Sequence, residues 1–202
     1  VLFLAWPAII EQIMLTLVQY VDTAMVGSLG SNATAAVGVT SSTSWLFNGF
    51  FNAAAIGYLI TRNATTAGAE GGCQAEVGSA SAMAASAAVE LFGGTPRQCM
   101  DAASFAMVNI LGLVCDPIGG LVENPCQNRN AMGASNALIS AELSLAGVKS
   151  ITPIDETIGV MYAVGRSIPS ELRETSLGGM AVAKSACENC MACANKRNKM
   201  KK

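Results

Sequence analysis

Three cysteines in turn-forming sequence are the feature that most constrains the fold of this chain. Cys73, Cys115 and Cys126 each stand among glycine, proline or asparagine residues, and they are separated by 42 and 11 residues. Turns bring distant parts of the backbone close together, so cysteines on turns can converge. Thiolates are soft ligands, and three of them can hold three irons of a four-iron cluster while the fourth iron stays free for substrate. On spacing alone, three buried structural cysteines remain the alternative interpretation.

The rest of the composition narrows the chemistry. The 202 residues include no histidine, which excludes Ser-His-Asp and Cys-His catalytic pairs and any zinc site with a histidine ligand within this sequence. The net charge of −2 indicates no nucleic-acid partner. Seven cysteines in a chain that reads as an intracellular enzyme favour metal binding over disulfides.

The local signals from residue 52 onward are those of helices. Thr95, Pro96 and Gln98 form a helix start, with Thr95 as N-cap and Gln98 completing a capping box. No apolar/polar alternation of useful length is present, so we predict an all-α domain. The pattern predicts a loop over residues 63–72 and helices over residues 53–60, 79–92, 96–111, 131–146 and 153–165.

The sequence around the three cysteines resembles a known enzyme family. The matching phrases read GAEGGCQAEVG from residue 68, GLVCDP from residue 112, ENPCQNRNAMGASNAL from residue 123 and LRETSLGG from residue 172. They are similar to the alpha chain of the iron–sulphur type of bacterial L-serine dehydratase, over roughly residues 52–184. The resemblance implies that Cys73, Cys115 and Cys126 bind a [4Fe-4S] cluster. It also implies that the chain carries the C-terminal part of such an alpha chain.

The function implied by this resemblance is deamination of L-serine to pyruvate and ammonia. In the family, an iron without a cysteine ligand polarises the C–O bond, a base removes the α-proton, and hydroxide leaves. The resulting aminoacrylate tautomerises and hydrolyses. The implied partners are L-serine and a serine dehydratase beta chain, and the implied location of the catalytic domain is the cytoplasm.

Residues 1–60 differ in character from the rest. Their only charged residues are Glu11 and Asp22, and Val1 to Tyr20 is almost continuously apolar, long enough to span a bilayer. The phrases PAIIEQ from residue 7 and VDTAMVGSLG from residue 21 resemble the first transmembrane helix of the MATE multidrug efflux family, in which an acidic residue matching Asp22 serves cation coupling. One full span and part of another cannot enclose a transport site between two repeats.

We therefore predict three parts in the chain. Residues 1–50 are a MATE-like fragment of one or two apolar, transmembrane-like helices, with membrane association through residues 1–20. Residues 51–185 are the dehydratase-like helical domain, and residues 186–202 are a cysteine-rich, basic tail. The alternative functions are a fragment of a MATE-type multidrug/cation antiporter and an inactive fusion product.

Polar residues near the cysteines are candidates for binding substrate, although the general base is not identifiable from the sequence. Arg129 and Asn130 can grip a carboxylate, with a surface salt bridge as the alternative for Arg129. Glu70 and Glu76 are either acid/base groups or acceptors of backbone hydrogen bonds. The hydroxyl and amide candidates, which are also common turn residues, are Asn63, Thr65, Ser79 and Ser81.

The tail holds three further cysteines. Cys187, Cys190 and Cys193 resemble the opening of a bacterial ferredoxin motif, but no fourth Cys-Pro follows. One interpretation makes one of them a further ligand of the cluster, reached through the flexible tether. The other interpretation is an independent metal site or exposed reactive thiols.

Deletion of residues 1–45 is expected to leave iron binding intact and to raise solubility. The reason is that the deleted segment offers apolar surface with no helix bundle to bury it. Iron and sulphide analysis of anaerobically purified protein, together with the soluble fraction after lysis, measures both effects. Loss of the cluster on deletion would instead show that the two parts form one folding unit.

Overall fold

Helices make up the regular structure of the described part of the chain. The computed structural model describes residues 17, 20, 21, 24, 25, 27 and 30–189, and the chain divides into two compact units, Val1–Phe47 and Asn48–Lys202. Within the described residues, extended pairing is limited to one isolated bridge between Cys115 and Arg173. The all-α prediction is confirmed for these residues. The α-helices are α2 (Ser31–Asn63), α3 (Gly68–Gly71), α4 (Cys73–Leu91), α5 (Pro96–Asn109), α6 (Cys126–Leu145), α7 (Ile154–Ser167) and α8 (Lys184–Asn189), and the 3-10 turns are η1 (Ile118–Gly120), η2 (Ser170–Leu172) and η3 (Gly179–Val182).

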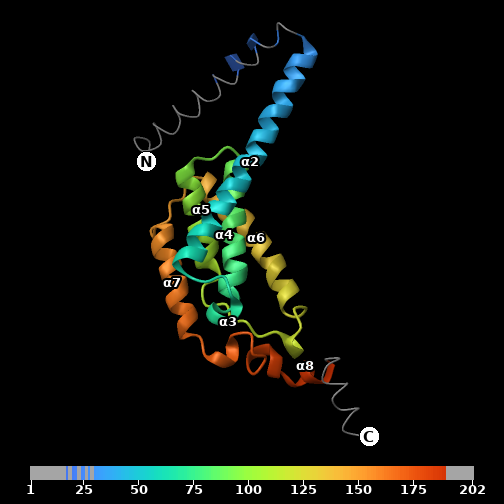
Figure 1. Ribbon diagram of the computed structural model, residues 1–202, viewed down its shortest axis with the longest axis vertical. Coiled ribbons are helices and arrows are strands. Elements are labelled where there is room, and N and C mark those ends of the chain that lie inside the picture. Colours follow the sequence, from blue (N-terminus) through green and yellow to red (C-terminus); the bar gives the residue numbers. More distant parts are fainter. Residues whose placement is uncertain (1–16, 18–19, 22–23, 26, 28–29, 190–202) are drawn as a thin grey trace. The chain divides into compact units, whose positions relative to one another are not determined.

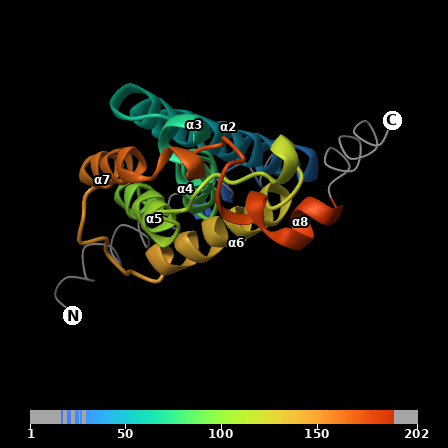
Figure 2. The ribbon, with the colours of Figure 1, turned by 90° about the horizontal axis from the view of Figure 1, so that it is seen from below.

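Helix α4 is the centre of the second unit. It packs against α5, α6 and α7, which surround it in both ribbon views (Figures 1 and 2). A small residue of α6 permits the close approach of α4: a Cβ added to Gly133 would lie 2.6 Å from Cγ1 of Val77. Burial of apolar surface in this core is the main stabilising term. The buried core residues are Ile56, Ile60, Ala75, Ala82, Ala85, Val89, Cys99, Ala102, Ala103, Ala106, Met107, Ala137, Ala141, Ile154, Ile158 and Met161.

The predicted start of α5 is confirmed. The Thr95 hydroxyl accepts a hydrogen bond from the Gln98 backbone N–H at 3.4 Å, and the Thr95 N–H donates to Gln98 Oε1 at 2.9 Å. These two bonds satisfy donors that a helix start would otherwise leave unpaired. Cys99, on the same helix, is 1% exposed and belongs to the hydrophobic core.

Two helices begin earlier than the sequence pattern indicates. Helix α4 begins at Cys73, although we expected it at residue 79. It follows Gly72, whose φ is 76°, and the Gln74 N–H at its start donates to Leu113 O at 2.9 Å. Gly78, just before the predicted start, lies inside the helix. Helix α6 begins at Cys126, although we expected it at residue 131. The polar run that argued against a helix there includes Arg129, whose side chain turns inward.

The apolar, transmembrane-like helices predicted for residues 1–50 find no support in the described residues. None of the helices described is long and apolar enough to cross a membrane. The predicted helix over residues 53–60 is part of the much longer α2, which spans 33 residues. Most of Val1 to Tyr20 lies outside the described residues, and the three-part division of the chain stays a prediction.

Two glycines of α7 are expected to respond oppositely to substitution by alanine. A Cβ at Gly165 would lie 2.7 Å from Gly71 Cα and 3.0 Å from Gln74 Nε2, so Gly165→Ala should lower the unfolding free energy by about 1–3 kcal/mol. Gly159 has nothing within 4 Å, so Gly159→Ala should raise it by up to about 1 kcal/mol through helix propensity. Urea unfolding followed by circular dichroism measures both. Equal stability of the two variants would contradict the close packing of α3 against α7.

Candidate metal centre

The three predicted ligands come from two helix starts and one extended segment. Cys73 is the first residue of α4 and Cys126 the first residue of α6. Cys115 lies between them in extended conformation, with its N–H donating to Leu172 O at 2.8 Å and its carbonyl accepting from Glu174 N at 2.7 Å. A helix start places unpaired N–H groups and a positive dipole end beside its first side chains, which favours negative charge there.

Two of the thiols meet a carboxylate. The Sγ atoms of Cys73 and Cys115 and a carboxylate oxygen of Glu76 all lie within 4.8 Å of one another. The two thiols are 2% and 3% exposed, whereas Glu76 reaches solvent. Cys126 is partly buried and near enough for the charge of Cys73 to affect its pKa. The structure therefore places the three predicted cysteines in one neighbourhood, although their role as cluster ligands stays a prediction.

A buried glutamine fixes the position of Cys73 relative to Cys115. The Gln74 side chain, 1% exposed, donates from Nε2 to Met161 O of α7 at 2.9 Å and accepts from Gly112 N at 2.8 Å. The Gln74 backbone N–H donates to Leu113 O at 2.9 Å. These bonds hold the segment before Cys115 against the start of α4. Our sequence reasoning missed this residue, and the signal was a polar side chain directly after a predicted ligand at the start of an apolar helix.

A buried ion pair joins α6 to the Cys115 segment. Arg129 Nη1 lies 2.6 Å from Asp116 Oδ1 and donates to Val114 O at 2.8 Å. Asp116 Oδ2 in turn accepts from the Met180 N–H at 2.6 Å, which ties in η3. The two charged side chains are 16% and 3% exposed, so this is a buried pair and not the surface salt bridge that we considered.

The surroundings shift the pKa values of the three thiols in different directions. A hydrogen bond from Cys115 and the positive charge of Arg129 lower the pKa of Cys73 to about 7, although burial opposes this. The same hydrogen bond, together with burial, raises the pKa of Cys115. Burial and the charge on Cys73 raise the pKa of Cys126. Within this pair, the negative charge is therefore favoured on Cys73 and the proton on Cys115.

Glu76 serves as an acceptor of a backbone hydrogen bond, one of its two predicted roles. Its Oε1 accepts from the Gly68 N–H at 3.2 Å. Burial, and next the negative charge of Glu174, raise its pKa, and the Gly68 hydrogen bond opposes them. Glu174 has a left-handed backbone, with φ at 64°, which side chains rarely adopt and which often marks functional sites.

The other predicted substrate residues have different surroundings. The Ser81 hydroxyl donates to Gly133 O at 2.8 Å at the contact of α4 with α6. The Asn63 side chain donates to the preceding turn of α2, and Thr65 accepts from the N–H of residue 67. Ser79 is buried, with no hydrogen-bond partner for its hydroxyl among the described residues, and Asn130 is exposed on α6. A substrate role for these residues stays a prediction.

The tail cysteines are placed only in part. Cys187 lies in α8, and its side chain is not among those described. Cys190 and Cys193 lie outside the described residues. Neither interpretation of the tail is therefore tested by the structure.

The donor set fits an iron–sulphur cluster. Three thiols from separate segments lie in one neighbourhood, and thiolates are the ligands that such clusters use. Two of them belong to a small apolar cluster with Val77, Ile110 and Leu113, which shields the sulphurs from water. A carboxylate beside two thiolates also suits a single divalent ion, so the ratio of iron to sulphide is the measurement that separates the two metal sites.

The metal-free chain is expected to show a thiolate titration near pH 7. Ultraviolet absorbance of the thiolate should rise through the Cys73 pKa of about 7, and Arg129→Met should move this step upward because a lowering charge is lost. The folded pKa lies below the ordinary value of 9.0, so this group stabilises the fold fully above pH 9.0 and loses that contribution as pH falls through about 7. Cys99→Ser is the control, since burial raises its pKa to about 11. A step that survives in Cys73→Ser would contradict the assignment.

Comparisons with known proteins find a family model and relatives that match most of this chain. The family model described as serine dehydratase alpha chain matches residues 23–181. The chain is 60% identical over 137 residues to the L-serine dehydratase alpha chain of Peptoniphilus asaccharolyticus, covering 68% of this chain and 47% of that protein. It is 57% identical over 131 residues to the probable L-serine dehydratase alpha chain of Bacillus subtilis (strain 168), covering 65% of this chain and 44% of the relative.

A second group of relatives is longer. The L-serine dehydratase of Helicobacter pylori (strain ATCC 700392 / 26695) is 48% identical over 129 residues, which are 63% of this chain and 28% of that protein. The chain thus spans about half the length of the first two relatives and less of this one. The family match starts at residue 23, within the part that we assigned to an efflux-type fragment, and the fusion is not shown. This chain belongs to the serine dehydratase alpha chain family.

Proposed function

We propose that this chain is the C-terminal part of an iron–sulphur L-serine dehydratase that converts L-serine to pyruvate and ammonia. The observation that carries the proposal is the meeting of Cys73 and Cys115, from segments 42 residues apart, with ligand atoms within 4.8 Å. Relatives at 57–60% identity that bear the L-serine dehydratase name support the substrate. The proposed partners are L-serine and a serine dehydratase beta chain, and the proposed location is the cytoplasm.

The residues of this chain prepare the site in three ways. Cys73, Cys115 and Cys126 would hold a [4Fe-4S] cluster, which when bound supplies a Lewis-acidic iron that polarises the C–O bond of the serine hydroxyl. The Arg129 guanidinium, held by Asp116, offsets negative charge at Cys73. The apolar contacts of Val77, together with Ile110 and Leu113, exclude water from the thiols.

We propose that the chain has the three parts predicted from the sequence. Residues 51–185 form the dehydratase domain, and residues 186–202 form the cysteine-rich tail. Residues 1–50 are proposed to derive from a MATE-type efflux fragment on the basis of the two phrases that begin at residues 7 and 21. Membrane association through residues 1–20 belongs to the same proposal.

Anaerobically prepared protein is expected to contain close to one four-iron cluster, with about four irons and four sulphides per chain. Single replacement of Cys73, Cys115 or Cys126 by serine should abolish the brown colour, because a neutral hydroxyl is a poor substitute for thiolate on iron. Cys99→Ser is the matched control: this cysteine is equally buried but lies in the main core. Iron and sulphide analysis with the visible spectrum provides the measurement.

Two results would reject the proposal. Normal iron and sulphide content in Cys115→Ser would remove the ligand assignment. About one metal ion per chain without sulphide in the unmodified protein would indicate a mononuclear site built from Cys73, Glu76 and Cys115.

A further inference from the structure

Arg173, whose backbone pairs with Cys115, forms no ion pair among the described residues. Among the described residues, the ion pairs are Arg97 with Asp101 and Arg129 with Asp116, and Arg173 takes part in neither. Its Nη1 donates weakly to the Glu70 carbonyl at 3.3 Å, and its buried Nε has no hydrogen-bond partner among the described residues. Unpaired buried donors are rare in native proteins, so each one calls for a reason.

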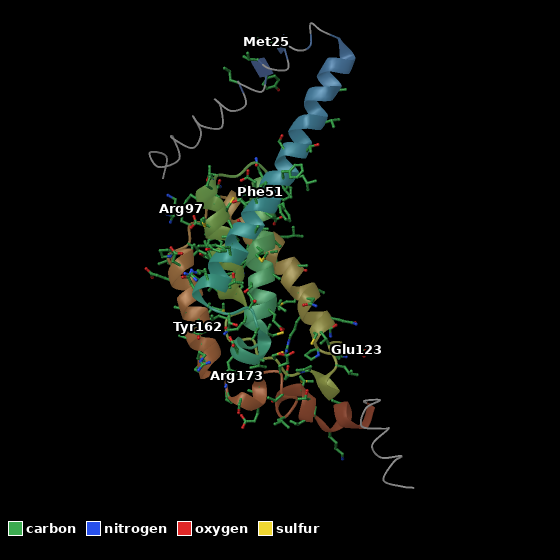
Figure 3. The ribbon with its side chains drawn as sticks, in the orientation of Figure 1. Met25, Phe51, Arg97, Glu123, Tyr162 and Arg173 are labelled. Carbon is green, nitrogen blue, oxygen red and sulfur yellow. The ribbon has the colours of Figure 1, made fainter. Side chains whose placement is uncertain are left out.

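The backbone pairs Arg173 with Cys115, one of the three predicted ligands. Cys115 and Arg173 are the paired residues of a parallel bridge, flanked by hydrogen bonds from Cys115 N to Leu172 O and from Glu174 N to Cys115 O. Side chains of directly paired residues leave neighbouring extended segments on the same side. Arg173 (labelled in Figure 3) therefore leaves its segment on the same side as the Cys115 side chain. Its Nη1 donates to the carbonyl of Glu70 in α3, the short helix that precedes Cys73.

The surroundings of the site create a need for this charge. Glu76 lies near both thiols, and a second carboxylate, Glu174, directly follows Arg173 along the chain. An incoming carboxylate would be repelled by these groups. Arg129 is already neutralised by Asp116 at 2.6 Å and is largely buried, whereas Arg173 is half-buried and keeps donors unused.

We infer that Arg173 binds the α-carboxylate of the substrate, a role that rests on the proposed function. A guanidinium matches a carboxylate with two parallel N–H donors, and such charge-assisted pairs are stronger than neutral hydrogen bonds. The site would thereby select 2-amino acids with a free carboxylate over their amides. Arg129, which we considered for this role from the sequence, instead holds the Cys115 segment through Asp116.

The test compares L-serine with L-serinamide, which keeps the hydroxyl and the amine but lacks the carboxylate. Both are titrated by calorimetry into the anaerobically prepared, iron-loaded full chain and its variants. Arg173→Gln should weaken L-serine binding roughly 10- to 100-fold and leave L-serinamide binding unchanged. The affinity of Arg173→Lys for L-serine should lie between those of the unmodified chain and Arg173→Gln, because lysine keeps the charge and loses the planar donor pair. Arg166→Gln, an exposed arginine of α7, is the control and should match the unmodified protein.

The outcomes separate this inference from the proposed function. Equal weakening of both ligands in Arg173→Gln, or an unchanged preference for L-serine, overturns the role of Arg173 and leaves the proposed function standing. If Arg173→Gln loses its iron, the preference measured in Arg173→Lys decides in the same way. An iron-loaded unmodified chain that binds neither ligand and forms no pyruvate overturns both.

Discussion

The candidate metal centre depends on a single buried amide. Gln74 connects the start of α4 to Met161 of α7 and to Gly112, just before the Cys115 segment, while its backbone N–H bonds Leu113. A buried side-chain amide without hydrogen bonds is energetically costly, so this position favours conformations in which Gln74 keeps all of these partners. Gln74 directly follows Cys73 and bonds residues just before Cys115. Its hydrogen bonds to α7 and to this segment therefore help to set the distance between the two thiols. Gly165 on α7, which leaves room for the Gln74 side chain and for Gly71, belongs to the same arrangement.

The ion pair between Arg129 and Asp116 sets the charge beside the thiols and joins α6 to the Cys115 segment. Arg129 offsets negative charge at Cys73, yet it does so only because Asp116 and the Val114 carbonyl hold it in a largely buried position. A buried pair of this kind adds little net stability, since both groups lose hydration, but removal of one member leaves an unpaired charge. The main effect of the pair is therefore to position Arg129 and Asp116, and not to stabilise the fold. It fixes α6, and with it Cys126, against the segment that carries Cys115.

The sequence revealed the helical class and the cysteines but not what holds them. The Thr95 capping box depends on side chains within one turn, so it could be predicted locally and is present. The starts of α4 and α6 could not, because distant residues contact them: the Gln74 N–H bonds Leu113 O, and Arg129 turns toward Asp116. Gln74 was missed for the same reason, since its partners lie about 38 and 87 residues away along the chain. The phrases around the cysteines indicated the family, which the family model shows, without revealing these distant contacts.

The three cysteines are held by different means. Cys73 and Cys126 begin helices, where free N–H groups and the dipole favour a negatively charged ligand. Cys115 has no helix, and its position comes instead from backbone hydrogen bonds to Leu172 and Glu174 on one neighbouring segment. The left-handed backbone of Glu174, which costs roughly 1–2 kcal/mol in a residue with a Cβ, is the consequence of turning that segment away immediately after the bridge. The same bridge that secures Cys115 directs Arg173 to its side, so the support of a ligand and the placement of a substrate-binding cation arise from one pair of hydrogen bonds.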